Sequence, residues 1–381
     1  MTELEQLIAE LCPNGVEYRK LEECCNILDK KRRPVTKAAR VAGEYPYYGA
    51  NGIQDYVSDY IFDGTYVLVG EDGSVITKAG TPVVTWAEGK IWVNNHAHII
   101  EEQKGVLLRY LFHYIQTIDV TPLIHGNIPK LTGGDFRALQ IPIPPLPVQS
   151  EIARILDNFT ELTAELTAEL TARKQQYEYY TEQLMDFGDN VRRLPLGEIG
   201  SVKMCKRILK SQTNTEGGIP FYKIGTFGKE PDAFISEEVF EEYKEKYSYP
   251  KKGDILISCS GTIGRTVVFD GEPAYFQDSN IVWLEHDEKI VTNKYLQYCY
   301  KKQPWQISTG GTIARLYNDN ILKARIPVPP IDEQERIVAI LDRFDTLCND
   351  ISSGLPAEIE ARQKQYEYYR DKLLAFGEVN V

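Results

Sequence analysis

The sequence has no paired arrangement of cysteines. Its seven cysteines are odd in number, and their spacings fit neither a zinc knuckle nor a disulfide framework. The opening stretch, Met1 to Glu5, has no basic region, and no apolar run is long enough for a signal peptide or a membrane span. These absences predict a soluble protein of a reducing, cytoplasmic compartment, with no membrane partner.

Excess positive charge is also missing. Lys and Arg number 43 against 55 Asp and Glu, which gives a formal net charge of −12. Such a balance disfavours a protein that coats nucleic acid unaided. With 381 residues, 43% hydrophobic content and 24 tyrosines, the chain is long and apolar enough for two or three domains with substantial cores.

No catalytic motif is recognisable in the sequence. The stretch Gly261 to Arg265 lacks the lysine of a phosphate-binding loop, and no glycine fingerprint for a dinucleotide or a methyl donor follows an expected strand. The nearest carboxylate and lysine set is Asp232 with Glu242 and Lys244. This set lies in an acidic run typical of a solvated helix face, so a nuclease site is the weaker interpretation.

Two histidines raise the question of a metal site. His96 and His98 could place two imidazoles on one face of a strand, but the sequence offers no cysteine or acidic partner close by, and Ser279 lies near the matching place later in the chain. Polar residues at the end of a strand are the better interpretation. We therefore expect no metal, no cofactor and no catalytic residue in this chain.

What the sequence does contain is a duplication. Between Ile141 and Phe159, ten of nineteen positions are identical to those 185 residues later. Each copy starts with a proline-rich run and continues as an expected helix, and each follows a segment rich in short strands and turns. The predicted order is globule, helix, globule, helix, with limits at residues 1–145, 146–190, 191–330 and 331–381.

The first helical copy is uninterrupted. No proline or glycine occurs from Val148 to Asp186, which predicts one helix about 58 Å long at roughly 1.5 Å per residue. Its apolar positions form a heptad seam with a four-residue stutter, and such a seam needs a partner helix, for which the second copy is the candidate. The predicted seam comprises Ile152, Leu156, Phe159, Leu162, Leu166, Leu170, Tyr177, Leu184 and Phe187.

The second helical copy departs from the first. It contains Ser352 to Pro356, a run that disfavours helix, so a break is expected there. From Phe344 to Arg362 is eighteen residues, against fourteen between the corresponding residues of the first copy. The four additional residues coincide with the expected break, so they are expected to form a loop.

The two globular segments repeat each other more weakly. The predicted correspondences are Tyr45–Tyr48 with Ile219–Tyr222, Gly64–Leu68 with Gly253–Ile257, and Gly126–Ile128 with Gly311–Ile313. The loops have diverged more than the helices, which suggests two related readers of different targets.

Basic residues recur at matching places in both globules, each beside an aromatic and small-residue loop. Such side chains could hold phosphates while loop side chains contact base edges. The alternative is that these basic residues are ordinary surface residues, but their recurrence in both copies favours DNA binding. The candidates are Lys31, Arg32, Arg33, Tyr47, Tyr48 and Asn51 in the first globule, and Lys206, Arg207, Tyr222, Lys223 and Arg265 in the second.

Several motifs together resemble the specificity subunits of type I restriction-modification enzymes. They are the proline-rich entry, the helix start from Gln149 to Phe159, the Thr-Ala-Glu-Leu units, and the ending from Arg173 to Tyr180. The resemblance covers the whole chain. It implies an α+β fold with a pseudo-two-fold repeat, in which two target-recognition domains are separated by two long antiparallel helices that form a coiled coil.

The same resemblance implies a function. Each domain would read half of a bipartite, asymmetric site on double-stranded DNA, with the helices as spacer. The partners would be two methylation subunits that bind S-adenosylmethionine, and motor-nuclease subunits that use ATP. This chain would be a non-catalytic adaptor without a cofactor of its own. The expected spacer and interface residues are Leu162, Leu166, Leu170, Tyr177, Tyr180, Leu184, Phe187, Tyr366, Tyr369, Leu373 and Phe376.

Two other classes of function stay open at this level. A coiled-coil scaffold that binds only proteins is favoured by the acidic balance and disfavoured by the paired basic loops. An enzyme with an unrecognised site is disfavoured by the lack of a catalytic set.

Overall fold

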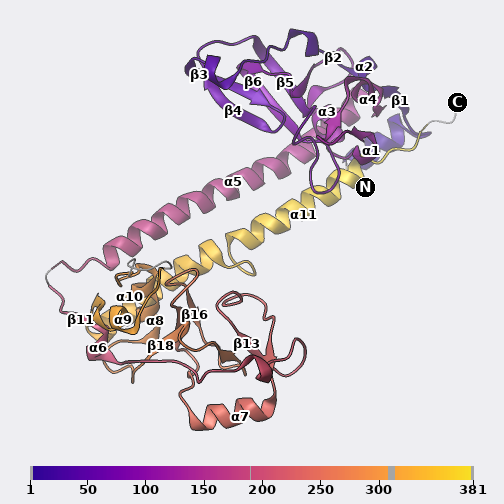
Figure 1. Cartoon of the computed structure of the whole chain (residues 1–381). Helices are drawn as coiled ribbons and strands as arrows, with labels where there is room; N and C mark the ends of the chain where they lie inside the picture. Colours follow the sequence, from indigo (N-terminus) through magenta and orange to yellow (C-terminus); the bar gives the residue numbers. More distant parts are fainter. Residues whose placement is uncertain (1–2, 189, 308–313, 379–381) are drawn as a thin grey trace. The chain divides into compact units, whose positions relative to one another are not determined.

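The computed structural model describes residues 3–188, 190–307 and 314–378. The chain divides into two compact units (Figure 1). Unit 1 comprises Met1–Glu169 with Ala357–Val381, and unit 2 comprises Leu170–Pro356. Each unit therefore combines one globule with part of both helical segments. The boundaries predicted between globules and helices, at residues 145, 190 and 330, are boundaries of sequence segments and stay a prediction.

The first helical segment is one continuous helix, α5, from Leu146 to Leu184 (Figure 1). The sequence predicted this helix from Val148 to Asp186, and the two ranges agree to within two residues at each end. Pro147 falls in the first turn, where a missing backbone N–H is tolerated. The absence of proline and glycine from the rest of the segment explains its length of 39 residues.

The second helical segment is broken, as predicted, into α10 (Ile331–Asn349) and α11 (Leu355–Leu373). The Asp350 carboxylate accepts hydrogen bonds from the Ser352 backbone N–H at 2.7 Å and the Ser353 hydroxyl at 2.6 Å. A Cβ on Gly354 would lie 2.4 Å from the Thr346 carbonyl oxygen, so only glycine fits this turn. The sequence predicted Pro356 as part of the break. In the structure it lies in the first turn of α11.

The globule of unit 1 is built on a six-stranded sheet of order β2-β7-β5-β6-β3-β4. Its strands are β2 (Asn26–Ile27), β3 (Ala42–Gly49), β4 (Gly52–Val57), β5 (Phe62–Gly70), β6 (Val84–Val93) and β7 (Ala97–Glu101). Two further pairs are β1 (Glu17–Lys20) with β10 (Gln140–Ile143), and β8 (Ile124–His125) with β9 (Lys130–Leu131). The helices are α1 (Glu3–Leu11), α2 (Leu21–Cys24), α3 (Leu108–Ile115) and α4 (Gly133–Ala138), with short 3₁₀ turns at Asp29–Lys31, Lys37–Ala39 and Thr121–Leu123.

The globule of unit 2 has two main sheets, of order β12-β18-β15-β16 and β14-β13-β17. Their strands are β12 (Ser201–Lys203), β13 (Ile219–Tyr222), β14 (Phe234–Ile235), β15 (Ile255–Ser258), β16 (Thr266–Val268), β17 (Tyr275–Phe276) and β18 (Ile281–Glu285). A separate pair joins β11 (Arg193–Pro195) to β19 (Arg325–Pro327). The helices are α6 (Leu196–Ile199), α7 (Glu237–Lys246), α8 (Asn293–Lys301) and α9 (Asn318–Lys323), with a 3₁₀ turn at Lys210–Gln212.

The two globules share one strand plan with one difference. In unit 1, β3 runs parallel to the end of β6, and in unit 2, β13 runs parallel to β17. The long strand β6 is replaced by two short strands, β16 and β17, on either side of a turn that contains Gly271 and Pro273. Because proline cannot donate to a ladder, the strand is interrupted and the sheet divides in two. The predicted correspondence of Tyr45–Tyr48 with Ile219–Tyr222 is confirmed by these parallel pairs.

A second predicted correspondence is wrong by one residue. Leu68 pairs with Ile99 in unit 1, and Leu256 pairs with Trp283 in unit 2. Both leucines point into a different buried cluster from their two chain neighbours. Leu68 therefore corresponds to Leu256, whereas the sequence comparison had set it against Ile257. A shift of one residue changes the face to which a strand side chain points, so burial decides the register.

A glutamine joins each globule to the helix that follows it. The Gln149 side chain accepts from the Leu107 N–H at 2.8 Å and donates to the Pro144 carbonyl at 2.7 Å. Gln334 makes the same two bonds, to the Thr292 N–H at 3.0 Å and to the Pro329 carbonyl at 2.9 Å. Both glutamine side chains are fully buried, so these bonds satisfy polar groups that would otherwise be costly.

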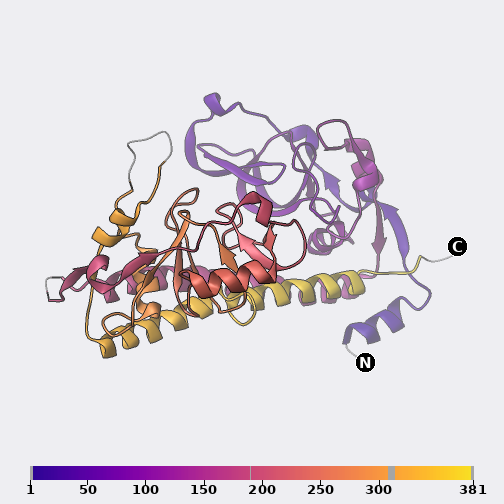
Figure 2. The same ribbon diagram turned by 60° about the horizontal axis from the view of Figure 1, so that its bottom comes forward.

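Each unit pairs the beginning of one helical segment with the end of the other. In unit 1, the ring of Phe159 in α5 stacks on Tyr369 in α11 at 5.3 Å. In unit 2, Phe344 in α10 stacks on Tyr180 in α5 at 5.5 Å. The expectation that the second copy supplies the partner helix is thus confirmed within each unit. Figure 2 shows the chain beyond α11 continuing to the C-terminus, where the Val16 N–H donates to the Gly377 carbonyl at 2.9 Å.

The middle of α5 carries a seam of half-buried residues. Leu162 is 36% exposed, while Thr163 beside it is half-buried, so the threonine occupies the seam position. The predicted seam position Leu162 is thus wrong, while the stutter stays a prediction. The half-buried positions of α5 from Phe159 onward are Phe159, Thr160, Thr163, Leu166, Leu170, Arg173, Tyr177, Thr181 and Leu184. Among the described residues, no helix is both long and apolar enough to cross a membrane.

Candidate nucleic-acid interface

Two of the predicted basic residues of unit 1 are exposed. Lys31 ends the first 3₁₀ turn, and Arg33 follows two residues later. The backbone of Arg33 is held by its N–H, which donates to the Val93 carbonyl at 3.2 Å, and by its carbonyl, which accepts from the Trp92 indole at 2.6 Å. A fixed backbone with an exposed cationic side chain suits a contact with phosphate.

Arg32, between them, has a different role from the one predicted. Its guanidinium lies 2.6 Å from a Glu71 carboxylate oxygen, 3.7 Å from Asp29, and donates to the Ala97 carbonyl at 2.6 Å. The side chain is only 12% exposed. Arg32 therefore neutralises two carboxylates inside unit 1 and is not available to DNA, which corrects the prediction.

The carboxyl of Asp29 is held ionised by this cluster. Burial raises its pKa, but the hydrogen bond from His98 and the charges of His98 and Arg32 outweigh burial and bring the pKa below its ordinary value. Both ring nitrogens of His98 face oxygen atoms, of Asp29 at 2.7 Å and of the Leu131 carbonyl at 3.1 Å. The ring also stacks on Phe136 at 4.2 Å, so His98 is a structural residue.

The donor atoms of Asp29, Glu71 and His98 lie within 4.8 Å of one another, a grouping that metal ions use. Here the guanidinium of Arg32 already pairs with the carboxylates, so the set fits an ion pair network better than a metal. His96 turns elsewhere and pairs with Asp72. The expectation that no acidic residue approaches these histidines was wrong, because the partners are distant in sequence.

The two predicted tyrosines of unit 1 belong to the core. Tyr47 is 1% exposed, and its hydroxyl bonds to the Val35 N–H at 3.0 Å and the Val35 carbonyl at 3.2 Å. The Arg40 guanidinium covers its ring at 4.1 Å. Tyr48 is 7% exposed and packs in the cluster of Phe62. Neither ring is placed to stack on a base, which corrects both predictions.

Asn51, in contrast, lies at the rim of a hollow. It is exposed in the β3–β4 turn. The hollow has a volume of about 540 Å³, and we call it the unit 1 hollow. It is lined by Ala50, Asn51, Gln54, Asp72, Gly73, Ser74, His96, Ile128 and Lys130. Because these residues come from four separate loops, the sequence suggested only Asn51 among them.

In unit 2, the predicted basic pair is exposed. Arg207 is 68% exposed and its Nε lies 3.0 Å from Asp278. Lys206 is exposed, and its ammonium lies 5.0 Å above the Tyr247 ring. Both side chains are thus at the surface, where a contact to phosphate is expected.

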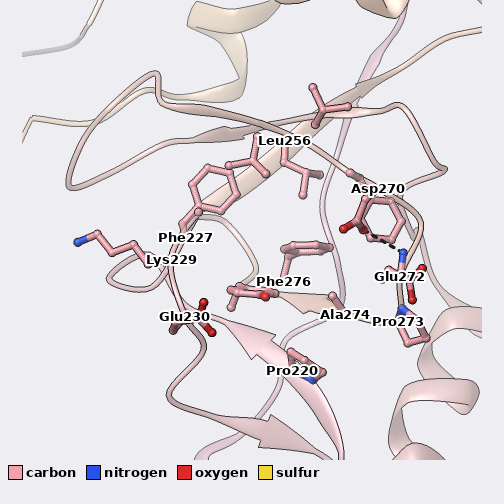
Figure 3. A pocket seen from close by; sticks show the side chains of 15 residues that line it. Pro220, Phe227, Lys229, Glu230, Leu256, Asp270, Glu272, Pro273, Ala274 and Phe276 are labelled. Carbon is pink, nitrogen blue, oxygen red and sulfur yellow. Dashed lines mark hydrogen bonds between the residues drawn. The ribbon is translucent and has the colours of Figure 1, made fainter. Parts of the chain in front are cut away.

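A cavity of about 410 Å³ in unit 2 includes one other predicted residue in its lining (Figure 3). Tyr222 lines it and stacks on Phe276 at 5.8 Å. Its rim carries the carboxylates of Glu230, Asp270 and Glu272 against the single ammonium of Lys229. Burial raises the pKa of the Tyr222 hydroxyl, and the charges of Glu230 and Asp270 add to that rise. This cavity is poorly suited to the DNA backbone.

Lys223 and Arg265 lie beside that cavity and make contacts within unit 2. Lys223 pairs with Asp232 at 2.9 Å, and the Arg265 guanidinium donates to the Gly228 carbonyl at 3.2 Å. Asp232 is thus paired, while Lys244 covers the rings of Phe240 and Tyr249. The carboxylate and lysine set considered for a nuclease is not brought together.

Unit 2 also has a hollow beside the loop before β18 and the start of α9, with a volume of about 600 Å³. We call it the unit 2 hollow, and it is lined by Met204, Ser279, Arg315, Leu316, Tyr317, Asn318, Asp319 and Asn320. The guanidinium of Arg315 donates to the Ser279 carbonyl at 2.7 Å. The predicted counterpart loop at Gly311–Ile313 lies outside the described residues.

Most of the predicted interface residues pack within their own unit. Tyr366 is 9% exposed, while Leu373 and Phe376 pack against the core of unit 1. Tyr177, Leu184 and Phe187 pack against the core of unit 2. Leu166 and Leu170 are half-buried seam residues.

Two tyrosine pairs at the ends of the helices stay exposed. Tyr179 and Tyr180 are 58% and 43% exposed, and Tyr368 and Tyr369 are 62% and 39% exposed. The rings of each pair meet edge to face, at 5.5 and 5.3 Å. Exposed tyrosines are enriched at protein interfaces. The sequence named one residue of each pair and missed Tyr179 and Tyr368.

Comparison with known proteins adds the family context. The model of the type I restriction modification DNA specificity domain matches residues 13–173 and 189–361. A putative type I restriction enzyme specificity subunit of Haemophilus influenzae is 54% identical over 371 residues, which cover 95% of this chain and 96% of that protein. The EcoR124I/EcoR124II specificity subunit of Escherichia coli is 36% identical over 298 residues, 72% of each chain.

Solved structures share the fold. The S subunit of a type I restriction-modification system from M. genitalium superposes with a TM-score of 0.61 at 16% identity, and covers 95% of this chain and 97% of that one. A chain from a study of complex assembly in the type I R-M system superposes with a TM-score of 0.53 at 19% identity, over 95% and 98% of the two chains.

Proposed function

The chain belongs to the family of type I restriction-modification specificity subunits, and on this premise we propose that each of its units reads one half of a bipartite site on double-stranded DNA. The single observation that carries the proposal is the duplication of one strand plan with different side chains on its loops. A scaffold without DNA readout, the alternative open from sequence, does not account for a DNA specificity domain that matches both halves of the chain.

The helices have two roles in this proposal. The continuous helix α5 contributes to both units and so sets the number of unspecified base pairs between the half-sites. The exposed tyrosine pairs, Tyr179 with Tyr180 and Tyr368 with Tyr369, dock two methylation subunits. Two equivalent surfaces on one chain favour two copies of the same partner.

The chemistry belongs to the partners. Methylation subunits bring S-adenosylmethionine and modify adenine, and motor-nuclease subunits bring ATP. This chain supplies specificity and positioning, and no catalytic residue or cofactor is assigned to it. The ion pairs that engage Arg32 and Asp232 support this division, because each of these charged groups is paired within its own unit.

Binding of DNA distinguishes this function from a scaffold. With a net charge of −12, the isolated chain neutralises few phosphates and binds DNA weakly and without sequence preference. Together with methylation subunits, it binds a bipartite site tightly in a mobility-shift assay. Tight specific binding by the chain alone would contradict this division of labour, and no specific binding by the assembled complex would contradict the proposed function.

A chimera tests whether the units read independently. Replacing residues 1–142 with the equivalent segment of a relative of different specificity changes one half-site of the methylated sequence and leaves the other intact. Methylated adenines mapped across a genome give the answer directly. A change in both halves would mean that the units do not read separately.

A further inference from the structure

The loops that form the two hollows rest on the same backbone frame. In unit 1 the Glu71 N–H donates to the His96 carbonyl at 2.8 Å, and in unit 2 the Cys259 N–H donates to the Asn280 carbonyl at 2.7 Å. A second backbone hydrogen bond also recurs. In unit 1 the Leu131 N–H donates to the Glu71 carbonyl at 2.9 Å. The matching bond in unit 2, from the Leu316 N–H to the Cys259 carbonyl, is also 2.9 Å. These bonds make His96 and Asn280 equivalent positions.

The residue that follows Glu71 or Cys259 points at this position in both units. Asp72 bonds through its carboxylate to Nδ1 of His96. The Ser260 hydroxyl donates to Oδ1 of Asn280 at 2.8 Å. The same pairwise contact is therefore made with different chemistry, on loops that share two backbone hydrogen bonds.

One polar atom of each pair is left without a partner in the described part of the chain, on a half-exposed ring in unit 1 and on a half-buried amide in unit 2. These atoms are Nε2 of His96 and the amide Nδ2 of Asn280. The His96 side chain is 47% exposed, and that of Asp72 is 25% exposed. Asp72 fixes the orientation of the imidazole and Ser260 that of the amide, so each of the two atoms is held in a defined direction, as base readout requires.

A cation stands beside each pair at an equivalent place. Lys130 immediately precedes Leu131 and is 45% exposed, with its ammonium 3.3 Å from Glu71. Arg315 immediately precedes Leu316 and lines the unit 2 hollow. An oriented polar group next to a cation is the arrangement that combines a base contact with a phosphate contact.

We propose that Asp72 with His96, and Ser260 with Asn280, are specificity-determining pairs of the two units. This inference rests on the proposed function. With Nδ1 of His96 engaged by Asp72, Nε2 is the ring atom left to meet a base edge in the major groove. Asn280 presents an amide donor, which suits the N7 or oxygen acceptors of a base. The equivalent positions thus read different bases.

An exchange of the pairs tests the inference. In the assembled methylation complex, the double variant D72S/H96N gives unit 1 the pair of unit 2, and S260D/N280H makes the reciprocal change. Each is expected to alter one base position in one half-site, to lower the preference there about ten- to hundredfold, and to leave the other half-site and the gap unchanged. A methylated sequence unchanged in both variants overturns the inference.

Controls separate this outcome from others. The single variants D72N and H96Q keep the size of each side chain and are expected to relax the same base position if the double variant fails to assemble; a retained preference in folded single variants overturns the inference. K104N changes an exposed residue outside the hollow and is expected to keep the sequence. A wild-type complex that methylates no bipartite site contradicts the proposed function itself.

Discussion

The imidazole of His113 and the hydroxyl of Tyr366 lie 3.1 Å apart in the interior of unit 1, although 253 residues separate them along the chain. The other ring nitrogen of His113 bonds to the Asp157 carboxylate at 2.7 Å. Burial lowers the pKa of the His113 imidazole, and the hydrogen bond to Asp157 offsets this only in part. The neutral ring therefore donates to Asp157 and accepts from Tyr366, which ties the end of α11 to α3 and α5.

Unit 2 has a related contact at the other end of the repeat. The Tyr177 hydroxyl in α5 lies 3.1 Å from an Asp345 carboxylate oxygen, and the Lys301 ammonium lies 3.0 Å from the same hydroxyl. The partners differ, but in both units a helix-end tyrosine is bonded to the adjoining globule or helix. Tyr177 and Tyr366, the first tyrosine of each repeated helix ending, are thus explained by contacts that close each unit.

Removing the Tyr366 hydroxyl is expected to weaken unit 1. Tyr366→Phe leaves an acceptor nitrogen of His113 buried without a partner, at a cost of about 1–3 kcal/mol. Urea unfolding of the two proteins measures the difference. Tyr368→Phe, at a position 62% exposed, is the control and is expected to change stability by less than about 0.5 kcal/mol. An equal loss of unfolding free energy in both variants would show that the buried hydrogen bond of Tyr366 does not stabilise unit 1.

The lowered pKa of His113 predicts a pH dependence of stability. The unfolded chain takes up this proton near the ordinary value of about 6.5, while the folded chain does so only at a lower pH. Stability is therefore fully present above about pH 6.5 and falls as the pH is lowered from there toward the folded pKa. Thermal unfolding between pH 7.5 and 5.5 is expected to show a smaller loss for His113→Asn than for the natural chain. Identical pH profiles would contradict the assignment.

Arg32 and Arg207 were both predicted DNA contacts, and the structure separates them. Arg32→Ala is expected to destabilise unit 1 by about 1–3 kcal/mol, because it removes a guanidinium that bonds to the Glu71 carboxylate and the Ala97 carbonyl, while His98 and Lys130 still face the carboxylates. Arg207→Ala, at a side chain 68% exposed, is expected to change stability by less than about 0.5 kcal/mol and to weaken DNA binding by the assembled complex. Comparable stability of the two variants would show that the Arg32 cluster is not structural.

Lengthening α5 tests its role as a spacer. One more Thr-Ala-Glu-Leu after Leu170 adds about 6 Å and turns the helix by about 400°, which leaves a residual of about 40°. The seam stays close to its register, so activity is expected to persist. Since the duplex advances about 3.4 Å per base pair, the unspecified gap is expected to widen by one, at most two, base pairs with both half-sites unchanged.

A shorter insertion is the matched control. Two residues at the same place rotate the rest of the helix by about 200°, which directs Arg173 and Tyr177 away from the seam and is expected to disrupt assembly. Methylated adenines mapped in cells that carry each variant distinguish the cases. An unchanged gap at full activity in the four-residue variant would show that α5 does not set the spacing.

The candidate site was predictable only in part. Recurrence of basic residues predicted Lys31, Arg33 and Arg207 as DNA contacts; the structure places these side chains at the surface, and the contact itself stays a prediction. Arg32, from the same basic run, and Tyr47, from the aromatic loop beside it, are instead used inside unit 1. The pairing of Asp72 with His96 could not be found from sequence, because 24 residues separate the two partners; the sequence had suggested His96 only together with His98, as a possible metal site.

The sequence by itself determined the repeat, the continuous first helix, the break in the second helix and the family, because proline, glycine and heptad spacing act over a few neighbouring residues and leave a local pattern. The tertiary structure alone decided which half of each helix serves which unit, the register of Leu68 with Leu256, and which polar residues face outward. Those outcomes depend on burial between segments far apart in the chain. A one-residue shift reverses the face of a strand side chain, and one distant carboxylate converts a surface arginine into a buried counter-charge.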